Sequence, residues 1–262
     1  MMSSQNPAFR ACIVIPFYNH ETSIGELLRQ LRPLQLACYL VNDASDPHCG
    51  QVLATLAQSE AQWLQVISYQ PNQGKGQAVM TGMAAAARDG HTHAVQIDAD
   101  RQHRVSDLQL LLNMARMQPA AVVAGYAVYD ATVPGSRRYG RYLTHLWVWI
   151  NTWSFAIRDS MCGLRVYPTG VALEVWQRSN RHAFSRIGRR MSFDIEILVR
   201  LYWRGLQIIN MPVAVTYPSN GVSHFRMWRD NVDISLAHAR LFCGMLWRAP
   251  RWLWRSPGSS AT

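Results

Sequence analysis

The first 125 residues alternate short apolar runs with segments of helical spacing, and this alternation constrains the fold more than any other feature. Continuous apolar runs of strand length lie at residues 11–15, 38–41, 64–67, 94–97 and 120–124. Segments with helical spacing separate them, at residues 26–36, 51–57, 76–88 and 107–117. Strands that are apolar throughout and alternate with helices are typical of parallel sheets covered on both faces. The sequence therefore predicts an α/β fold, with a Rossmann-like, mostly parallel sheet flanked by helices.

The second half of the chain has a different character. Residues 139–157 predict an aromatic helix, a last strand is expected over residues 207–211 and then 213–217, and residues 241–255 mix Trp with Arg. We expect a disordered N-terminus at residues 1–9, one main domain at 10–231, an amphipathic segment at 232–255 and a disordered tail at 256–262. The main domain divides at about residue 125 into two halves.

The chain is strongly basic. It carries 26 Lys and Arg against 16 Asp and Glu, a net charge of +10, and Arg supplies nearly all of the positive charge. The planar guanidinium binds phosphate oxygens in pairs. This composition suits nucleotide diphosphates, lipid phosphates, an anionic membrane or nucleic acid, and the charge alone does not choose among them.

Residues 94–103 carry the most specific chemistry of the chain. An apolar strand ends in Asp98 and Asp100, and the carboxamide of Gln102 follows. If the strand turns after Asp98, these oxygens can converge at its carboxyl end, where Mg²⁺ or Mn²⁺ would be held together with substrate phosphates. The stretch predicts a site for a metal-bound diphosphate, and a solvated acidic turn is the alternative that spacing alone leaves open.

Polar residues also follow the other predicted strands. Tyr18 and Asn19 come after the first strand, Asp43 after the second and Lys75 after the third. Ligands of open α/β sheets collect beyond the carboxyl ends of the strands. We therefore expect these loops to form one site together with Asp98 and Asp100.

Six segments in order resemble a family 2 glycosyltransferase with the GT-A fold, closest to the dolichyl- or polyprenyl-phosphate mannose synthase branch. The resemblance covers about residues 10–231, and its segments are residues 14–19, 41–45, 72–76, 98–103, 159–165 and 193–196. It implies a nucleotide-diphosphate-sugar donor, with a UDP- or GDP-sugar as the candidates, and Mg²⁺ or Mn²⁺ as cofactor. Residues 10–125 would bind the nucleotide sugar and 126–231 the acceptor.

The resemblance also assigns the binding residues. Asp98, Asp100 and Gln102 would hold the metal, and Asp43 would bond the base in a pocket lined by Pro16, Tyr18 and Asn19. For Asp43, a turn or helix cap is the alternative reading. Further donor contacts, on the diphosphate and from a loop that closes over donor and acceptor, are expected from Lys75, Arg137, Arg165, Ser223, His224 and Arg226.

Catalytic roles are expected for Asp100, Asp194 and Asp159. A carboxylate such as Asp194, in an apolar helical segment, can act as a general base. A hydroxyl acceptor needs such a base, whereas a lipid phosphate is already a competent nucleophile. Asp159 is the second candidate for the base or for an acceptor contact.

Three departures from the family pattern qualify the resemblance. His20 stands where Glu is common, Asn42 replaces the first Asp of an Asp pair, and residues 186–191 lack the Gln-x-x-Arg-Trp motif of processive synthases. The first two leave the donor base open. The third favours transfer of a single sugar, and inversion at the anomeric carbon is a family implication.

The expected acceptor is lipid-linked or hydrophobic, either a polyprenyl phosphate or a hydroxyl on a cell-envelope precursor. The Trp- and Arg-rich residues 241–255 are interpreted as a membrane-interface helix, with core packing as the alternative. Five scattered Cys and no recognisable signal peptide favour a cytoplasmic, peripheral protein at the inner face of the cytoplasmic membrane.

The second hypothesis for the function is a non-enzymatic basic protein that holds acidic lipid or nucleic acid through a nucleotide-type fold. No nucleic-acid-binding module is recognisable in the sequence, so we expect no nucleic-acid partner. The oligomeric state stays open.

Overall fold

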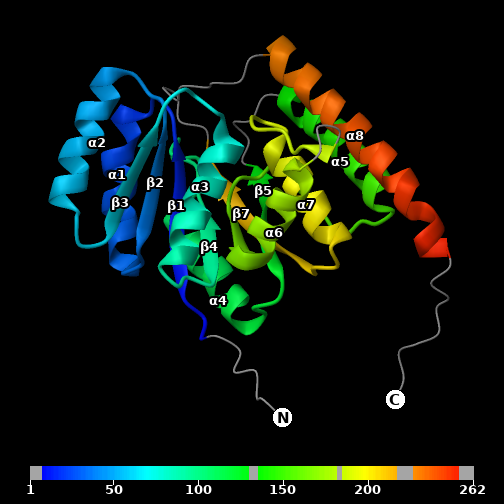
Figure 1. Ribbon diagram of the computed structural model, residues 1–262, viewed down its shortest axis with the longest axis horizontal. Coiled ribbons are helices and arrows are strands. Elements are labelled where there is room, and N and C mark those ends of the chain that lie inside the picture. The colour runs from blue at the N-terminus through cyan, green and yellow to red at the C-terminus, as the bar shows by residue number, and fades with distance from the viewer. Residues whose placement is uncertain (1–7, 130–134, 182–184, 217–226, 254–262) are drawn as a thin grey trace.

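The computed structural model describes residues 8–129, 135–181, 185–216 and 227–253, and their side chains except those of residues 129, 135–139, 227 and 249–253. A seven-stranded sheet in the order β3-β2-β1-β4-β6-β5-β7 forms its centre (Figure 1). β6 runs antiparallel to β4 and β5, and the other pairs are parallel, which confirms the mostly parallel sheet. The strands are Ala11–Phe17 (β1), Cys38–Asp43 (β2), Leu64–Tyr69 (β3), His93–Gln96 (β4), Val122–Tyr129 (β5), Arg165–Pro168 (β6) and Ile208–Val215 (β7).

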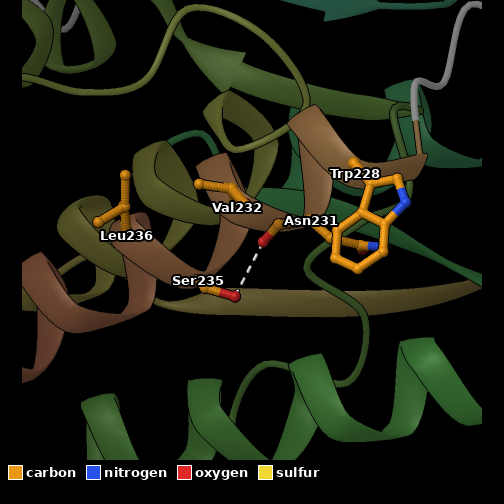
Figure 2. A pocket seen from close by; sticks show the side chains of 5 residues that line it. All are labelled: Trp228, Asn231, Val232, Ser235 and Leu236. Carbon is orange, nitrogen blue, oxygen red and sulfur yellow. Dashed lines mark hydrogen bonds between the residues drawn. The ribbon is translucent and has the colours of Figure 1, made fainter.

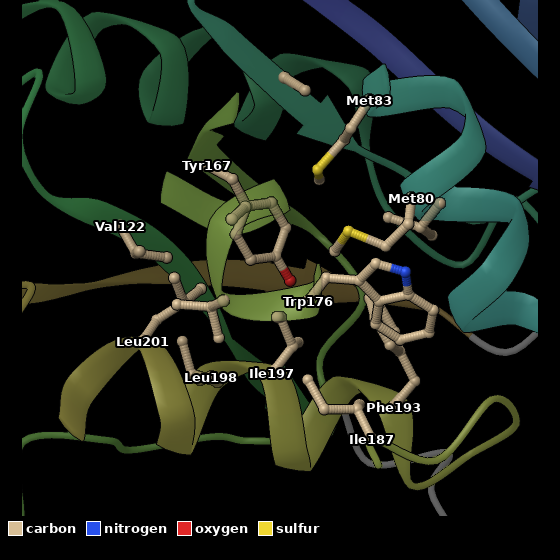
Figure 3. Close-up of a cluster of buried hydrophobic side chains, with 14 of the residues drawn as sticks. Met80, Met83, Val122, Tyr167, Trp176, Ile187, Phe193, Ile197, Leu198 and Leu201 are labelled. Carbon is tan, nitrogen blue, oxygen red and sulfur yellow. The ribbon is translucent and has the colours of Figure 1, made fainter. Parts of the chain in front are cut away.

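Helices cover both faces of this sheet. Alternate residues of β1 enter different cores: Cys12 and Val14 pack with α3, α6 and α7, whereas Ile13 and Ile15 pack with α1, α2 and α4. Figure 3 shows the first of these cores, which contains Met80 and Met83 of α3 together with Trp176. The helices are Glu21–Leu31 (α1), Pro47–Ser59 (α2), Lys75–Arg88 (α3), Val105–Met117 (α4), Gly135–Thr152 (α5), Thr169–Asn180 (α6), Phe193–Trp203 (α7) and Met227–Leu253 (α8).

Several boundaries differ from the expectation. The helix expected at residues 26–36 begins at Glu21 and ends at Leu31, because Pro33 lies in a separate 3₁₀ turn, Arg32–Leu34. The last strand, expected over residues 207–217, is β7 and ends at Val215; it tolerates Pro212 because it lies at the edge of the sheet. Phe9, which was expected in the N-terminal segment 1–9, packs on the ring of His93.

Four loops at the carboxyl edge of the sheet each contain a residue in the left-handed backbone region. They are Asn19 after β1, Ala44 after β2, Gly74 after β3 and Arg101 after β4, with φ between 50° and 91°. Non-glycine residues adopt this region at an energetic cost and do so mostly at functional sites. The loops turn sharply there and bring the polar residues after the strands to one edge.

α5 and α8 pack side by side, away from the centre of the sheet (Figure 1). Trp147 contacts His238 and Phe242, and Asn151 contacts His238, so the second half of α5 packs against the middle of α8. α8 begins at Met227, earlier than the amphipathic segment expected at residues 232–255. In the described ranges, no helix combines the length and the apolar character needed to cross a bilayer.

Candidate functional site

Asp98 follows β4 at the carboxyl edge of the sheet. Its Oδ2 accepts a hydrogen bond from Lys75, whereas its buried Oδ1 has no hydrogen-bond partner among the described residues. Gly163 lies against this carboxylate so closely that a Cβ there would meet Oδ2, and would lie 2.8 Å from Cγ. Burial opposes ionisation of Asp98, but the charge of Lys75 holds its pKa below the usual value. Asp98 is therefore an ionised group with one oxygen left for a ligand.

Asp100 and Gln102 continue the same turn. The Gln102 backbone N–H donates to Asp100 Oδ1 over 3.1 Å. Burial and then the neighbouring charge of Asp98 raise the pKa of Asp100 to about 6. Asp98 and Asp100 repel each other, and one oxygen of Asp98 has no partner among the described residues. Such a pair of carboxylates fits a hard divalent cation that completes its shell with phosphate and water. No group of three or more His, Cys, Asp or Glu side chains able to hold a metal occurs in the described residues, so the phosphates would have to supply the remaining ligands.

Lys75 joins two parts of the site. Its Nζ donates to Asp98 Oδ2 over 2.8 Å and to Asp194 Oδ2 over 2.7 Å. The flanking residues fix it: Gly74 has φ 91°, and the Cβ of any larger residue at position 76 would enter the ring of Phe193. Burial opposes its charge, but the two carboxylates raise its pKa above the usual value. Lys75 is also the one lysine in the 262-residue sequence.

Asp194 lies in the first turn of α7, and both of its side-chain oxygens accept hydrogen bonds. Lys75 donates to Oδ2, and Gln96 of β4 donates to Oδ1 over 2.9 Å. Gln96 was not expected at the site, although a carboxamide in the otherwise apolar run 94–97 was a signal that could have found it. Each side-chain oxygen of Asp194 therefore has a hydrogen-bond donor.

The expectation that Arg165 contacts donor phosphates is wrong for this structure. The side chain is 0% exposed and lies within β6. Its guanidinium donates to the backbone oxygens of Asp194 and Ser160 over 2.6 and 2.7 Å and to the hydroxyl of Tyr167. Arg165 therefore holds the start of α7 and the 159–163 loop in place.

Asp159 is likewise buried, and both of its side-chain oxygens already accept hydrogen bonds, which argues against a role as a base. Arg141 donates to both of its oxygens, the backbone N–H groups of residues 127, 161 and 162 donate as well, and His145 Nε2 lies 3.4 Å from Oδ1. Burial opposes its charge, but these contacts hold its pKa well below the usual value. Asp159 connects α5 to the loop before β6, so its predicted catalytic role is corrected to a structural one.

The residues expected to line a base pocket lie together at the ends of β1 and β2. Ser45 Oγ accepts from the Asn19 backbone N–H, and the two oxygens of Asp43 accept from the N–H groups of Gln73 and Gly74. Pro16 lies at the end of β1, and Tyr18 is partly exposed beside it. Asp43 therefore fixes the loop before Lys75, and its contact with a base stays a prediction.

The other expected contacts lie outside the described part of the chain. Arg137 belongs to α5, but its side chain is not described, and Ser223, His224 and Arg226 precede α8 in residues 217–226. Their roles remain predictions.

A protein-family model matches this chain. The model described as "Glycosyl transferase family 2" matches residues 12–192, which run from the start of β1 to the residue before α7 and include Lys75, Asp98 and Asp100. Among curated relatives, the polyprenol monophosphomannose synthase of Mycolicibacterium smegmatis is 25% identical over 83% of this chain and 81% of its own length. An undecaprenyl-phosphate 4-deoxy-4-formamido-L-arabinose transferase of Pseudomonas fluorescens is 28% identical over 59% of this chain and 46% of its own length.

Solved structures share the fold. The glucosyl-3-phosphoglycerate synthase of Mycobacterium tuberculosis aligns over 92% of this chain and 80% of its own, with a TM-score of 0.62 and 16% identity. A mannosyltransferase of Pyrobaculum calidifontis, solved with GDP-Man and Mn²⁺, covers 98% of this chain and 78% of its own, with a TM-score of 0.53 and 16% identity. These similarities confirm a GT-A-like sheet.

Proposed function

Since the chain belongs to glycosyl transferase family 2, we propose that it transfers one sugar from a nucleotide-diphosphate sugar to a polyprenyl phosphate. The observation that carries the choice of acceptor is the state of Asp194. Its two side-chain oxygens accept hydrogen bonds from Lys75 and Gln96, at 2.7 and 2.9 Å. The printed names of the two kinds of curated relative support the same acceptor class.

A hydroxyl acceptor and a phosphate acceptor differ in whether they need a base. A hydroxyl acceptor must lose its proton in the transition state, and a positioned base with a suitable pKa accelerates that step. Asp194 has no oxygen free to take that proton, because Lys75 and Gln96 already donate to both of them. A phosphate monoester is already anionic and needs no base, so an engaged Asp194 is compatible with it.

Transfer would be a single displacement. An acceptor phosphate oxygen forms a bond to the anomeric carbon while the bond from that carbon to the donor diphosphate breaks, and the nucleoside diphosphate leaves with the electron pair. Attack from the opposite side inverts the anomeric configuration. The residues named here offer no covalent nucleophile, since Asp194 is paired with Lys75 and Asp159 with Arg141.

Asp98, Asp100 and Gln102 would hold Mg²⁺ or Mn²⁺ on the donor diphosphate. When bound, the cation supplies positive charge that offsets the charge developing on the leaving group. Lys75 keeps Asp98 ionised and oriented, with Oδ1 left for that cation. The base pocket of Pro16, Tyr18, Asn19 and Asp43 would bind the nucleoside at the neighbouring strand ends.

The acceptor surface would be formed by α5 and α8. Large apolar side chains are exposed on these helices, with Trp228 86% and Trp247 78% exposed. A pocket of about 590 Å³ on α8 is lined by Trp228, Asn231, Val232, Ser235 and Leu236. Figure 2 shows these side chains on the helix. The other exposed apolar residues of the pair and its connection are Tyr142, Leu143, Leu146, Trp147, Ile150, Trp153, Phe155 and Leu246.

Exposed apolar surface of this extent is typical of membrane or partner contacts, and Trp prefers the headgroup level of a bilayer. Together with the net charge of +10, this surface supports docking on an anionic membrane, which we place at the inner face of the cytoplasmic membrane. The interface expected at residues 241–255 thus extends to α5 and to the start of α8.

The proposal is tested with the purified full chain, radiolabelled UDP- and GDP-sugars, and vesicles containing polyprenyl phosphate. We expect lipid-extractable label with one donor class, only with Mg²⁺ or Mn²⁺, and its loss in the matched variants Asp98→Asn and Asp100→Asn. Transfer that persists without a divalent cation would overturn the metal assignment. Vesicle binding that ignores these variants, with no turnover of any donor, would instead support the non-enzymatic binder.

A further inference from the structure

The segment of residues 186–192, which precedes α7, is held from two sides, and we call it the bridging segment. It connects two regions: the amino end of α3, which carries Lys75, and the inner face of α8. Ile187 and Phe193, at either end of it, are buried with Trp176 in the core that Figure 3 shows. Asp194 follows it directly.

On the first side the bridging segment contacts the residues next to Lys75. The Gly76 N–H donates to Arg189 O over 2.8 Å. Gly74 lies so close that a Cβ there would meet the same carbonyl oxygen, and a Cβ at Gly76 would meet the ring of Phe193. A shift of the bridging segment must therefore move the backbone around Lys75 as well as Asp194.

On the second side α8 supplies the partners. Arg190 Nε lies 3.1 Å from Asp230 Oδ1, and Ser192 Oγ donates to Asp233 Oδ2 over 2.6 Å. These contacts hold both halves of the turn that leads into α7.

Glu196 links α8 to the start of the bridging segment. Its Oε1 accepts from Arg240 of α8 over 2.6 Å and from the Gly188 N–H over 3.0 Å. Arg200 also pairs with Glu196, and the side chain of Glu196 is 0% exposed. A Cβ at Gly188 would meet Ser192 Oγ, so the turn is closed tightly around this carboxylate.

We propose that Asp230, Asp233 and Arg240 of α8 are positioning residues for the transfer reaction, which hold the bridging segment so that Lys75 meets Asp194 and Asp98. This inference rests on the proposed function. The inner face of α8 already has an apolar anchor in Ile234, Ala237, Leu241 and Met245. Buried ionic contacts add little net stability to such an anchor, but they fix geometry.

The single lysine provides a direct readout that does not need turnover. Lysine labelled with ¹³C at Cε gives one side-chain signal in the full chain, because Lys75 is the one lysine of the sequence. Its chemical shift and line width report the contacts with Asp98 and Asp194. Hydrogen exchange of residues 74–78 and 186–194 reports the backbone of the same contacts.

The test compares Asp233→Ala and Arg240→Gln with Asp233→Asn, which keeps an acceptor oxygen for Ser192. We expect the first two to shift or broaden the Lys75 signal and to speed exchange in both segments. We also expect kcat to fall by about tenfold or more, while donor KM changes by less than about twofold, since misplacing reacting groups slows the chemical step. Asp233→Asn should stay close to the wild type in all readouts.

Ile234→Ala is the matched control, because Ile234 lies on the same inner face and makes apolar contacts there. It should lower the melting temperature without shifting the Lys75 signal. The inference is overturned if Asp233→Ala and Arg240→Gln keep the wild-type signal and kcat, or if Ile234→Ala reproduces their changes. If the wild-type chain turns over no donor but the variants still shift the Lys75 signal, the link from α8 to Lys75 is supported and only the proposed function is overturned.

Discussion

Lys75 and Asp194, separated by 119 positions in the chain, meet in an ion pair with 2.7 Å between Nζ and Oδ2. The contact joins the amino end of α3 to the first turn of α7, and the second bond of Lys75 reaches Asp98 beyond β4. One ammonium group therefore aligns the expected metal ligand with the carboxylate that sequence reasoning expected to be a base.

Replacing Lys75 with Met should destabilise the protein and abolish most of the transfer. Removal of one partner from a buried ion network leaves uncompensated charge and costs about 3 kcal/mol. We expect a lower free energy of unfolding in urea and a kcat reduced by about a hundredfold, because Asp98 loses its alignment. Equilibrium unfolding and steady-state kinetics measure the two effects.

The double variant Lys75→Met/Asp194→Asn serves as the control for this prediction. It removes the carboxylate that the single variant leaves unpaired, so its loss of stability should be smaller than the sum of the two single variants. Strict additivity would mean that the ion pair contributes nothing to the fold.

Gly163→Ala should weaken divalent-metal binding with little effect on the fold. The added methyl group would meet the Asp98 carboxylate and must displace it. We expect the affinity for Mn²⁺ in the presence of UDP or GDP to fall by about tenfold or more, as measured by calorimetry. Gly170→Ala is the matched control, since a Cβ there meets no heavy atom within 4 Å. Equal affinities in both variants would exclude Asp98 as a ligand.

Arg165→Met should lower stability and kcat without changing donor KM. The guanidinium bonds Asp194 O and Ser160 O from a fully buried position, so its loss leaves two buried carbonyl groups without that donor. A donor KM raised tenfold or more at an unchanged kcat would instead support a contact of Arg165 with the donor phosphates, which the structure argues against.

The difference between the predicted and observed roles of Arg165 shows where sequence reasoning succeeded and failed. The order of strands and helices could be predicted up to β5, because apolar runs and helical spacing reflect burial directly. β6 has only four residues and α6 follows it at once, so neither produced a periodic signal of sufficient length. Without β6 in view, Arg165 had the pattern of a loop arginine.

The residues of the candidate site could likewise be predicted only in part. Asp98, Asp100 and Lys75 could be predicted because they follow strands whose carboxyl ends share an edge. The partners of Asp159 and Asp194 could not, since Arg141 and Gln96 come close through packing between elements distant in the sequence. The contacts of the bridging segment with α8 were equally invisible, because they join residues about 40 positions apart.

The stability of the α5–α8 pair should fall in mild acid through His238. This side chain is buried against Trp147, and burial lowers its pKa to about 4. An unfolded His has a pKa of about 6.5, so the unfolded state binds more protons between these values and stability is lost as the pH falls from about 6.5 to 4. The loss attributable to this group reaches about 3 kcal/mol.

His238→Leu should reduce that acid sensitivity. The free energy of unfolding measured at pH 7 and at pH 5 should differ less in the variant than in the wild type, because Leu binds no proton in either state. An identical pH dependence in both proteins would show that His238 is not the titrating group.

The central claim is that an engaged Asp194 suits a phosphate acceptor and not a hydroxyl. It is tested most directly by offering the enzyme, with its donor and Mn²⁺, two acceptors of equal chain length in the same vesicles: a polyprenyl phosphate and the corresponding polyprenol. The account predicts a glycosyl phosphate lipid from the first and no product from the second. A glycoside formed on the polyprenol at a comparable rate would contradict it.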